Sequence, residues 1–129
     1  MKFEFDSRQP IYQQIIDKII TQIATGRLAP GARVASVRDL ALAYNVNPNT
    51  MQRSLARLEE MGYLHTERQS RFVTNDAAMV AALVRQMPQK IIAAFVQEMT
   101  DIGISAGQIA PLVTDYIERM GNNGENTAN

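Results

Sequence analysis

The side chains best suited to chemistry lie in a short segment, residues 48–61, that follows Asn47. If this segment is a helix of about 100° per residue with Met51 facing inward, its opposite side carries amide and basic groups. These are Asn49, Gln52, Arg53 and Arg57, with the small Ala56 among them. In the major groove, Arg pairs with guanine N7 and O6, and Asn or Gln pairs with adenine N6 and N7. The segment therefore predicts reading of base edges; taken alone, a solvated polar face is the alternative.

Further side chains have the chemistry to contact nucleic acid from outside this face. Arg38, early in a neighbouring helix, is predicted to meet a phosphate or a base edge, with an exposed ion pair as the alternative. The hydroxyls of Thr50 and Ser54 could donate to phosphate, and Thr50 could equally bond within its own helical turn. Arg68 and Arg71 flank a polar turn and are predicted to reach phosphate or the minor groove, with simple turn solubility as the alternative.

The composition disfavours an enzyme. Among 129 residues there is no Cys and no Trp, and His65 is the single His, so thiolate, zinc–cysteine and Ser-His-Asp chemistry find no support. His65 is interpreted as an ordinary strand residue, with a phosphate contact beside the wing as the alternative. None of the seven glycines forms a GxGxxG or GxxxxGK[ST] pattern. We therefore expect no catalytic activity, no cofactor and no metal.

The charges are unevenly distributed although the formal net charge is zero. Residues 1–75 hold ten Lys and Arg against seven Asp and Glu, whereas residues 76–129 hold three against six. Only the basic first half is suited to phosphate. No apolar stretch is expected to reach the ~20 residues of a membrane span, and the N-terminus lacks a signal-peptide pattern. These observations predict a cytoplasmic protein without a membrane partner.

Helix and turn signals indicate how the basic half is built. An apolar stripe between Pro10 and Gly26 predicts a first helix. After a Pro30-Gly31 turn, Ser36 is predicted to cap a short second helix. Asn47 and Pro48 then fit the N-cap and the first position of a third helix. Two short helices joined by a three- or four-residue turn predict a helix-turn-helix.

The segment after the third helix predicts a wing. Residues 63–67 and 71–75 have strand character and are joined by a polar turn. The wing ends the first predicted domain, residues 1–75, so the fold is expected to be mainly helical (α+β) with an N-terminal winged helix-turn-helix.

The acidic half predicts two helices. Apolar residues recur every three or four positions from Val80 to Ile102, and Pro88 is expected to kink or divide this helix. Ser105 and Gln108 predict a capping box that starts a last helix. We assign residues 76–121 to a two-helix domain and residues 122–129 to a disordered tail.

The apolar stripe of these two helices is wide and carries few charges. Two helices packed against each other would leave part of it uncovered, and uncovered apolar surface commonly meets a second copy. We therefore expect a homodimer through residues 77–120, with a monomeric core as the alternative. A two-fold dimer would also read inverted half-sites about one helical turn apart on DNA.

Several motifs together resemble the winged helix-turn-helix of GntR-family bacterial transcription regulators. They are PIYQQI, GRLAPGARV, the S-V-R-D-L-A segment, and VNPNT followed by LEEMGYL. They span about half the chain in the family's order, which is more specific than any single motif. The short C-terminal part, with its IGIS break, is similar to the YtrA-type subgroup.

This resemblance implies a homodimeric DNA-binding regulator, usually a repressor. Arg38 matches the family's DNA-contacting Arg in the S-x-R segment, and the turn at Arg68–Arg71 falls on the wing. Asn49, Thr50, Gln52 and Arg53 fall on recognition-helix positions. The chain departs from the family pattern in having Ala35 before the S-x-R Ser, a wing that is short and free of glycine, and a proline at position 88.

The sequence thus predicts a DNA-binding transcriptional regulator whose partners are operator DNA and a second copy. The alternative is a winged-helix module that binds another protein and reads no DNA. The sequence identifies no small-molecule effector and no operator.

Overall fold

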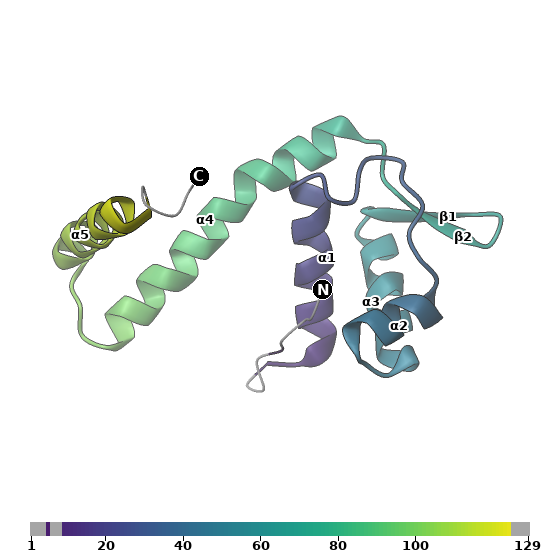
Figure 1. The fold of residues 1–129 in the computed structure, drawn as a ribbon, viewed down its shortest axis with the longest axis horizontal. Coiled ribbons are helices and arrows are strands. Elements are labelled where there is room, and N and C mark those ends of the chain that lie inside the picture. Colours follow the sequence, from purple (N-terminus) through teal and green to yellow (C-terminus); the bar gives the residue numbers. More distant parts are fainter. Residues whose placement is uncertain (1–4, 6–8, 125–129) are drawn as a thin grey trace. The chain divides into compact units, whose positions relative to one another are not determined.

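In the computed structural model, which describes residues 5 and 9–124, the chain is mainly helical with one small sheet (Figure 1). Its elements are α1 Ile11–Ala24, α2 Val37–Tyr44, α3 Pro48–Glu60, β1 Leu64–Glu67, β2 Ser70–Val73, α4 Ala77–Asp101 and α5 Ala106–Gly124. The chain divides into two compact units, one up to Val84 and one from Arg85 onward. The predicted fold class, a winged helix-turn-helix followed by helices, is confirmed.

The core of the first unit lies between α1 and α3. Four isoleucines lie on one face of α1 and are at most 2% exposed: Ile15, Ile16, Ile19 and Ile23. They meet Met51, Leu55 and Leu58 of α3, which are fully buried. Because each helix turns about 100° per residue, this apolar seam leaves the opposite side of α3 in solvent. The same packing therefore stabilises the unit and presents the polar face.

The short helix α2 is fixed by its two ends and by one aromatic side chain. Ser36 Oγ accepts a hydrogen bond of 3.1 Å from the backbone N–H of Asp39, as predicted. Asn45 ends the helix in the left-handed conformation at φ 55°. Tyr44 is buried, and this burial raises its pKa, although a side-chain hydrogen bond with Gln22 of α1 acts in the opposite direction. The second helix is thus attached to the first.

The predicted start of α3 is also confirmed. Asn47 Oδ1 accepts a 2.7 Å hydrogen bond from the backbone N–H of Asn49, and Pro48 occupies the first helical position. The side-chain oxygen satisfies one of the free N–H groups of the first turn, and Pro48 has no N–H to satisfy. α3 therefore begins at a fixed residue.

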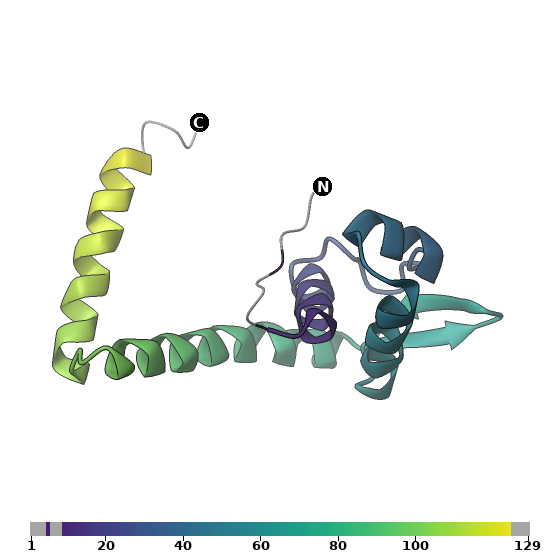
Figure 2. The same ribbon diagram turned by 90° about the horizontal axis from the view of Figure 1, so that it is seen from below.

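The wing is an antiparallel hairpin that projects from the helices in both ribbon views (Figures 1 and 2). Leu64 pairs with Val73 and Glu67 with Ser70, so the strands are Leu64–Glu67 and Ser70–Val73, slightly different from the predicted bounds. The turn has two residues, Arg68 and Gln69, both at positive φ. Two-residue hairpin turns of this kind normally use Gly or Asn, and this one is formed by Arg and Gln.

A third extended piece, at Arg33 and Val34, lies against the wing. Arg33 bridges Phe72, and the N–H of Val34 donates to the carbonyl of Arg71 at 2.8 Å. The turn before it requires Gly31, which has φ 77° and would place a Cβ 2.6 Å from Oδ1 of Asn75. A side chain at position 31 would therefore clash with Asn75, in the connection between β2 and α4.

We expected Pro88 to kink or divide its helix, and the prediction of a division is wrong. α4 runs through Pro88 as one helix of 25 residues. Proline removes only its own hydrogen bond to the carbonyl four residues earlier, and the helical segments on both sides are long enough to continue. The first compact unit reaches into this helix, where Leu83 is buried.

α5 begins as predicted and ends later than predicted. The N–H of Ser105 donates to Gln108 Oε1 at 2.9 Å, which confirms the capping box. The helix continues to Gly124, so the predicted disordered tail is wrong for residues 122–124; residues 125–129 lie outside the described part. Figure 2 shows α5 diverging from the end of α4.

The prediction that no apolar stretch reaches the length of a membrane span is also wrong. By length and composition α4 would suffice to cross a membrane, and little of it is buried within the chain. One such helix is weak support for a membrane protein, because amphipathic helices of oligomers meet the same criteria.

The cap of α3 gives a test of the fold. Asn47→Ala removes the hydrogen bond to the N–H of Asn49 and should lower the free energy of unfolding by about 1 kcal/mol. Urea denaturation followed by circular dichroism measures this. Asn49→Ala keeps the cap and should change stability by less than about 0.5 kcal/mol, as expected for an exposed position. Equal losses in both variants would contradict the capping role.

Candidate nucleic-acid interface

The exposed side of α3 brings together three of the predicted site residues. Asn49, Gln52 and Arg53 are all exposed in the first two turns. Positions three and four apart are neighbours on a helix, so the two amides and the guanidinium form one face. The buried side chains of Met51 and Leu55 fix the rotation of α3 about its own axis. The arrangement offers donors and acceptors on a rigid, convex surface.

Arg53 has a partner that the sequence analysis missed. Its Cζ lies 4.9 Å from the centroid of the Tyr12 ring, which is half-buried on α1. Tyr12 lies next to the apolar stripe of α1, and its place in that pattern does not indicate a polar contact. Only the crossing of α1 and α3 brings positions 12 and 53 together, and no local sequence signal reveals it.

The two hydroxyls of α3 have different roles. Ser54 is fully buried, and its Oγ lies 2.9 Å from the Thr50 carbonyl and 3.4 Å from the Tyr12 carbonyl. The expectation that Ser54 donates to phosphate is therefore wrong, because its hydroxyl bonds within its own helix and to α1. Thr50 is half-buried beside the polar face.

Two predicted arginines flank the polar face on the helices. Arg38 is exposed near the start of α2, two residues after the capping Ser36. Arg57 is exposed one turn beyond Arg53, and its Nη1 lies 3.1 Å from Glu60 Oε2. This ion pair is highly exposed and is expected to exchange readily for other partners.

The two predicted wing arginines are not equivalent. Arg68 is exposed at the tip of the hairpin. The Arg71 side chain is only 18% exposed, and its Nε lies 3.6 Å from Glu59 Oε1 of α3. Arg71 Nε is buried and has no hydrogen-bond partner within the described part of the chain. Arg71 is thus directed toward α3, and Arg68 is the arginine that the wing presents.

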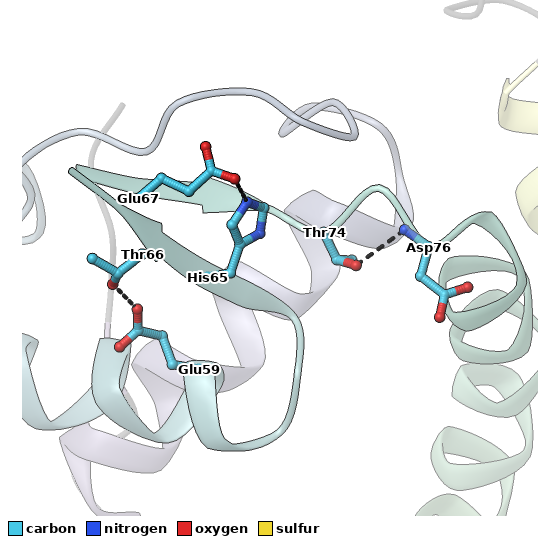
Figure 3. A network of polar contacts seen from close by, with 6 residues as sticks. All are labelled: Glu59, His65, Thr66, Glu67, Thr74 and Asp76. Carbon is cyan, nitrogen blue, oxygen red and sulfur yellow. Dashed lines mark hydrogen bonds and ion pairs between the residues drawn. The ribbon is translucent and has the colours of Figure 1, made fainter. Parts of the chain in front are cut away.

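Glu59 links the end of α3 to both strands of the wing, and Figure 3 shows its contact with Thr66 on β1. It accepts a hydrogen bond from Thr66 Oγ1 on β1 and faces Arg71 on β2. Thr66 and Arg71 are paired in the sheet register, so one carboxylate contacts a matched pair. This cluster fixes the wing relative to α3.

His65 is a strand residue with local contacts. Its ring is stacked on Phe72, with ring centroids 5.9 Å apart, and its Nε2 lies 3.3 Å from Glu67 Oε1 (Figure 3). In the part of the chain that the structure describes, no group of three or more His, Asp or Glu could hold a metal ion.

Several known proteins are similar to this chain in sequence or fold. The family model of bacterial regulatory proteins of the gntR family matches residues 11–73. The uncharacterized HTH-type transcriptional regulator YhcF of Bacillus subtilis (strain 168) is 32% identical over 119 residues, which are 92% of this chain and 98% of that protein. The HTH-type transcriptional repressor YtrA of the same organism is 39% identical over 62 residues, or 48% of each chain.

A solved structure is similar over most of the chain. A GntR family transcriptional regulator from Listeria monocytogenes superimposes with a TM-score of 0.76 and is 36% identical, covering 86% of this chain and 98% of that one. The similarity therefore includes the C-terminal helices as well as residues 11–73.

The Glu59 cluster predicts a stability difference between two adjacent glutamates. Glu59→Ala removes the partner of a largely buried arginine and should lower the free energy of unfolding by about 2 kcal/mol, between the values for exposed and buried pairs. Glu60→Ala breaks an exposed pair and should cost less than about 0.5 kcal/mol. Chemical denaturation of both variants makes the comparison. A Glu59→Ala protein as stable as Glu60→Ala would show that the cluster does not hold the wing.

Proposed function

The chain belongs to the gntR family of bacterial regulatory proteins and is a DNA-binding transcriptional regulator, and we propose that it reads an inverted-repeat operator as a homodimeric repressor. The observation that carries this proposal is the exposed Asn49, Gln52 and Arg53 face of α3, held rigid by the buried side of the same helix. On this basis α3 enters the major groove. Asn49 and Gln52 would select adenine and Arg53 guanine.

The remaining basic groups position the protein on the backbone. Arg38 and Arg57 would contact phosphates beside the groove, with Thr50 available as a hydroxyl donor. Arg68 at the wing tip is suited to phosphate or the minor groove. Arg71 contributes through Glu59, by holding the wing, and adds positive charge one residue pair behind the pair that closes the turn. Neutralised phosphates release counterions, so binding should weaken steeply as salt rises.

A homodimer follows from the second unit. Among its described side chains only Ile109 is buried, whereas several large apolar residues are roughly half exposed or more. They are Ile91, Ile92, Ile102, Leu112, Tyr116, Ile117 and Met120. α4 and α5 also line an apolar groove formed by Phe95, Met99, Leu112, Val113 and Tyr116. A second copy of this chain would cover these surfaces through residues 77–120.

This assignment also accounts for the apolar character of α4 without a membrane. Lys90 lies near the middle of α4, where a bilayer-spanning helix would place it at the centre of the hydrocarbon. A charged side chain at the centre of a bilayer costs free energy, whereas at the edge of a dimer interface the Lys90 ammonium group stays in water. The proposed location is therefore the cytoplasm, together with the DNA.

Repression is proposed because the relative YtrA is a repressor by name. A dimer bound over a promoter would block access of the transcription machinery. No residue group assigns an effector, so the proposal includes none.

Base discrimination by Arg53 tests the role of α3. The Arg53→Ala protein should lose about 1–3 kcal/mol of preference for its selected duplex over random DNA, as expected for one bidentate base contact. Competition binding on both duplexes at fixed salt measures the preference. Arg27→Ala, an exposed arginine after the far end of α1, is the control and should keep the preference. Equal weakening on both duplexes would make Arg53 a phosphate contact.

The oligomeric state tests the second unit. At micromolar concentration, sedimentation equilibrium should give twice the 14.4 kDa mass of the chain. Ile117→Lys places a charge on the exposed apolar surface and should shift the mass toward the monomer, because the charge would have to be buried. Glu118→Lys, on an exposed polar position of the same helix, should remain dimeric. A monomeric wild-type protein would refute the dimer.

A further inference from the structure

We propose that Tyr12 is a specificity-determining positioning residue: its ring is the platform that holds the Arg53 guanidinium for reading guanine. This inference rests on the proposed DNA-reading role of α3 and adds a residue from outside the helix-turn-helix. Tyr12 lies on α1, which the predicted site did not include. The starting observation is the 4.9 Å distance from Arg53 Cζ to the Tyr12 ring centroid.

The contact lies in the range of a cation–π interaction. A guanidinium within about 6 Å of the centroid of an aromatic ring is attracted by the negative face of the ring. Arg53 is exposed and has a long flexible side chain, whereas Tyr12 is half-buried. The more rigid partner therefore sets where the mobile one rests.

The Tyr12 ring is itself fixed by α1–α3 packing. The residues that follow one turn later on α1, Ile15 and Ile16, are buried in the seam. The carbonyl of Tyr12 lies 3.4 Å from the hydroxyl of fully buried Ser54, the residue next to Arg53. The backbone of Tyr12 and the helix that carries Arg53 are thus connected at one point, which fixes the platform relative to the reading face.

The contact with Tyr12 leaves the hydrogen-bond donors of the guanidinium available. In the described part of the chain Arg53 Cζ lies over the Tyr12 ring and its N–H groups meet no oxygen acceptor, so these donors remain for a base. Arg57, one turn later, shows the opposite arrangement, because its Nη1 is directed at Glu60 Oε2 at 3.1 Å. Of these two arginines, Arg53 is the one restrained without using its donors.

A restrained arginine with free donors is prepared for bidentate pairing. Ordering a long side chain on binding costs free energy, and part of that cost has already been met when the side chain is held in place. Guanine N7 and O6 accept from two parallel N–H groups, so the benefit of alignment is largest at that base. Tyr12 should therefore affect recognition of the guanine opposite Arg53 and leave other positions unchanged.

The experiment uses the full chain and the duplex that the wild-type protein selects from randomised double-stranded DNA. Tyr12→Leu removes the aromatic face and should weaken binding to this duplex about fivefold. Most of this loss should disappear on a duplex in which the guanine contacted by Arg53 is replaced. Tyr12→Phe keeps the ring and should bind within about twofold of wild type. In an Arg53→Ala background, Tyr12→Leu should have no further effect on binding.

Two controls separate positioning from folding. Perfluorinated phenylalanine at position 12 keeps the ring shape and reverses the charge of its face, so it should behave like Tyr12→Leu. Without DNA, the Arg53 side-chain NMR signals should show a ring-current shift in wild type and Tyr12→Phe that is lost in Tyr12→Leu. Tyr63→Leu, at another half-buried tyrosine, should keep this Arg53 shift.

The outcomes distinguish the inference from the proposal on which it rests. If the wild-type chain selects no sequence, the proposed function fails, whatever the NMR signals show. If it selects a sequence and the perfluorinated variant binds like Tyr12→Phe, DNA reading stands and the platform role of Tyr12 is refuted. Additive losses from Tyr12→Leu and Arg53→Ala would also refute it, because independent sites add and coupled sites do not.

Discussion

The structure of the first unit depends on the dry contact between α1 and α3. Four isoleucines of α1 face Met51, Leu55 and Leu58, and burial of each such side chain contributes on the order of 2 kcal/mol. This contact sets the rotation of α3 about its own axis. If α3 rotated by one position, about 100°, a polar side chain would enter the seam and Arg53 would leave the exposed face. Stability and the direction of the polar face therefore have the same cause.

Polar contacts fix the exact positions of the helices and the wing, which apolar packing holds together. The caps at Ser36 and Asn47 fix where α2 and α3 begin. Glu59 at the far end of α3 attaches the wing through Thr66 and Arg71. Each of these contacts is worth little beside the core, yet each removes a degree of freedom from a surface that must match DNA.

The second unit follows a different principle. Its two helices leave most of their apolar side chains uncovered, so the chain alone does not complete a core there. By length and composition α4 meets the criteria for a membrane span. We place it in the interface of an oligomer instead. The position of Lys90 favours the second interpretation, which is why the proposal assigns this surface to a second copy.

The sequence by itself determined the elements whose signals are local. The isoleucine stripe, Ser36, and the Asn47-Pro48 pair each act within one helical turn, so helix positions, caps and the polar face of α3 could be predicted. The local rule that proline breaks a helix fails at Pro88, because the helical segments on both sides are long enough for α4 to continue. Likewise, the two-residue wing turn occurs without glycine because the paired strands impose it.

Only the tertiary structure decided which distant side chains meet. Tyr12 contacts Arg53 and Glu59 contacts Arg71 because helices cross and strands pair, and the sequence separation of these residues carries no sign of it. Ser54 became buried for the same reason, since the backbone of α1 passes over it. A residue's chemical type can be read from the chain, but its partner depends on packing between elements.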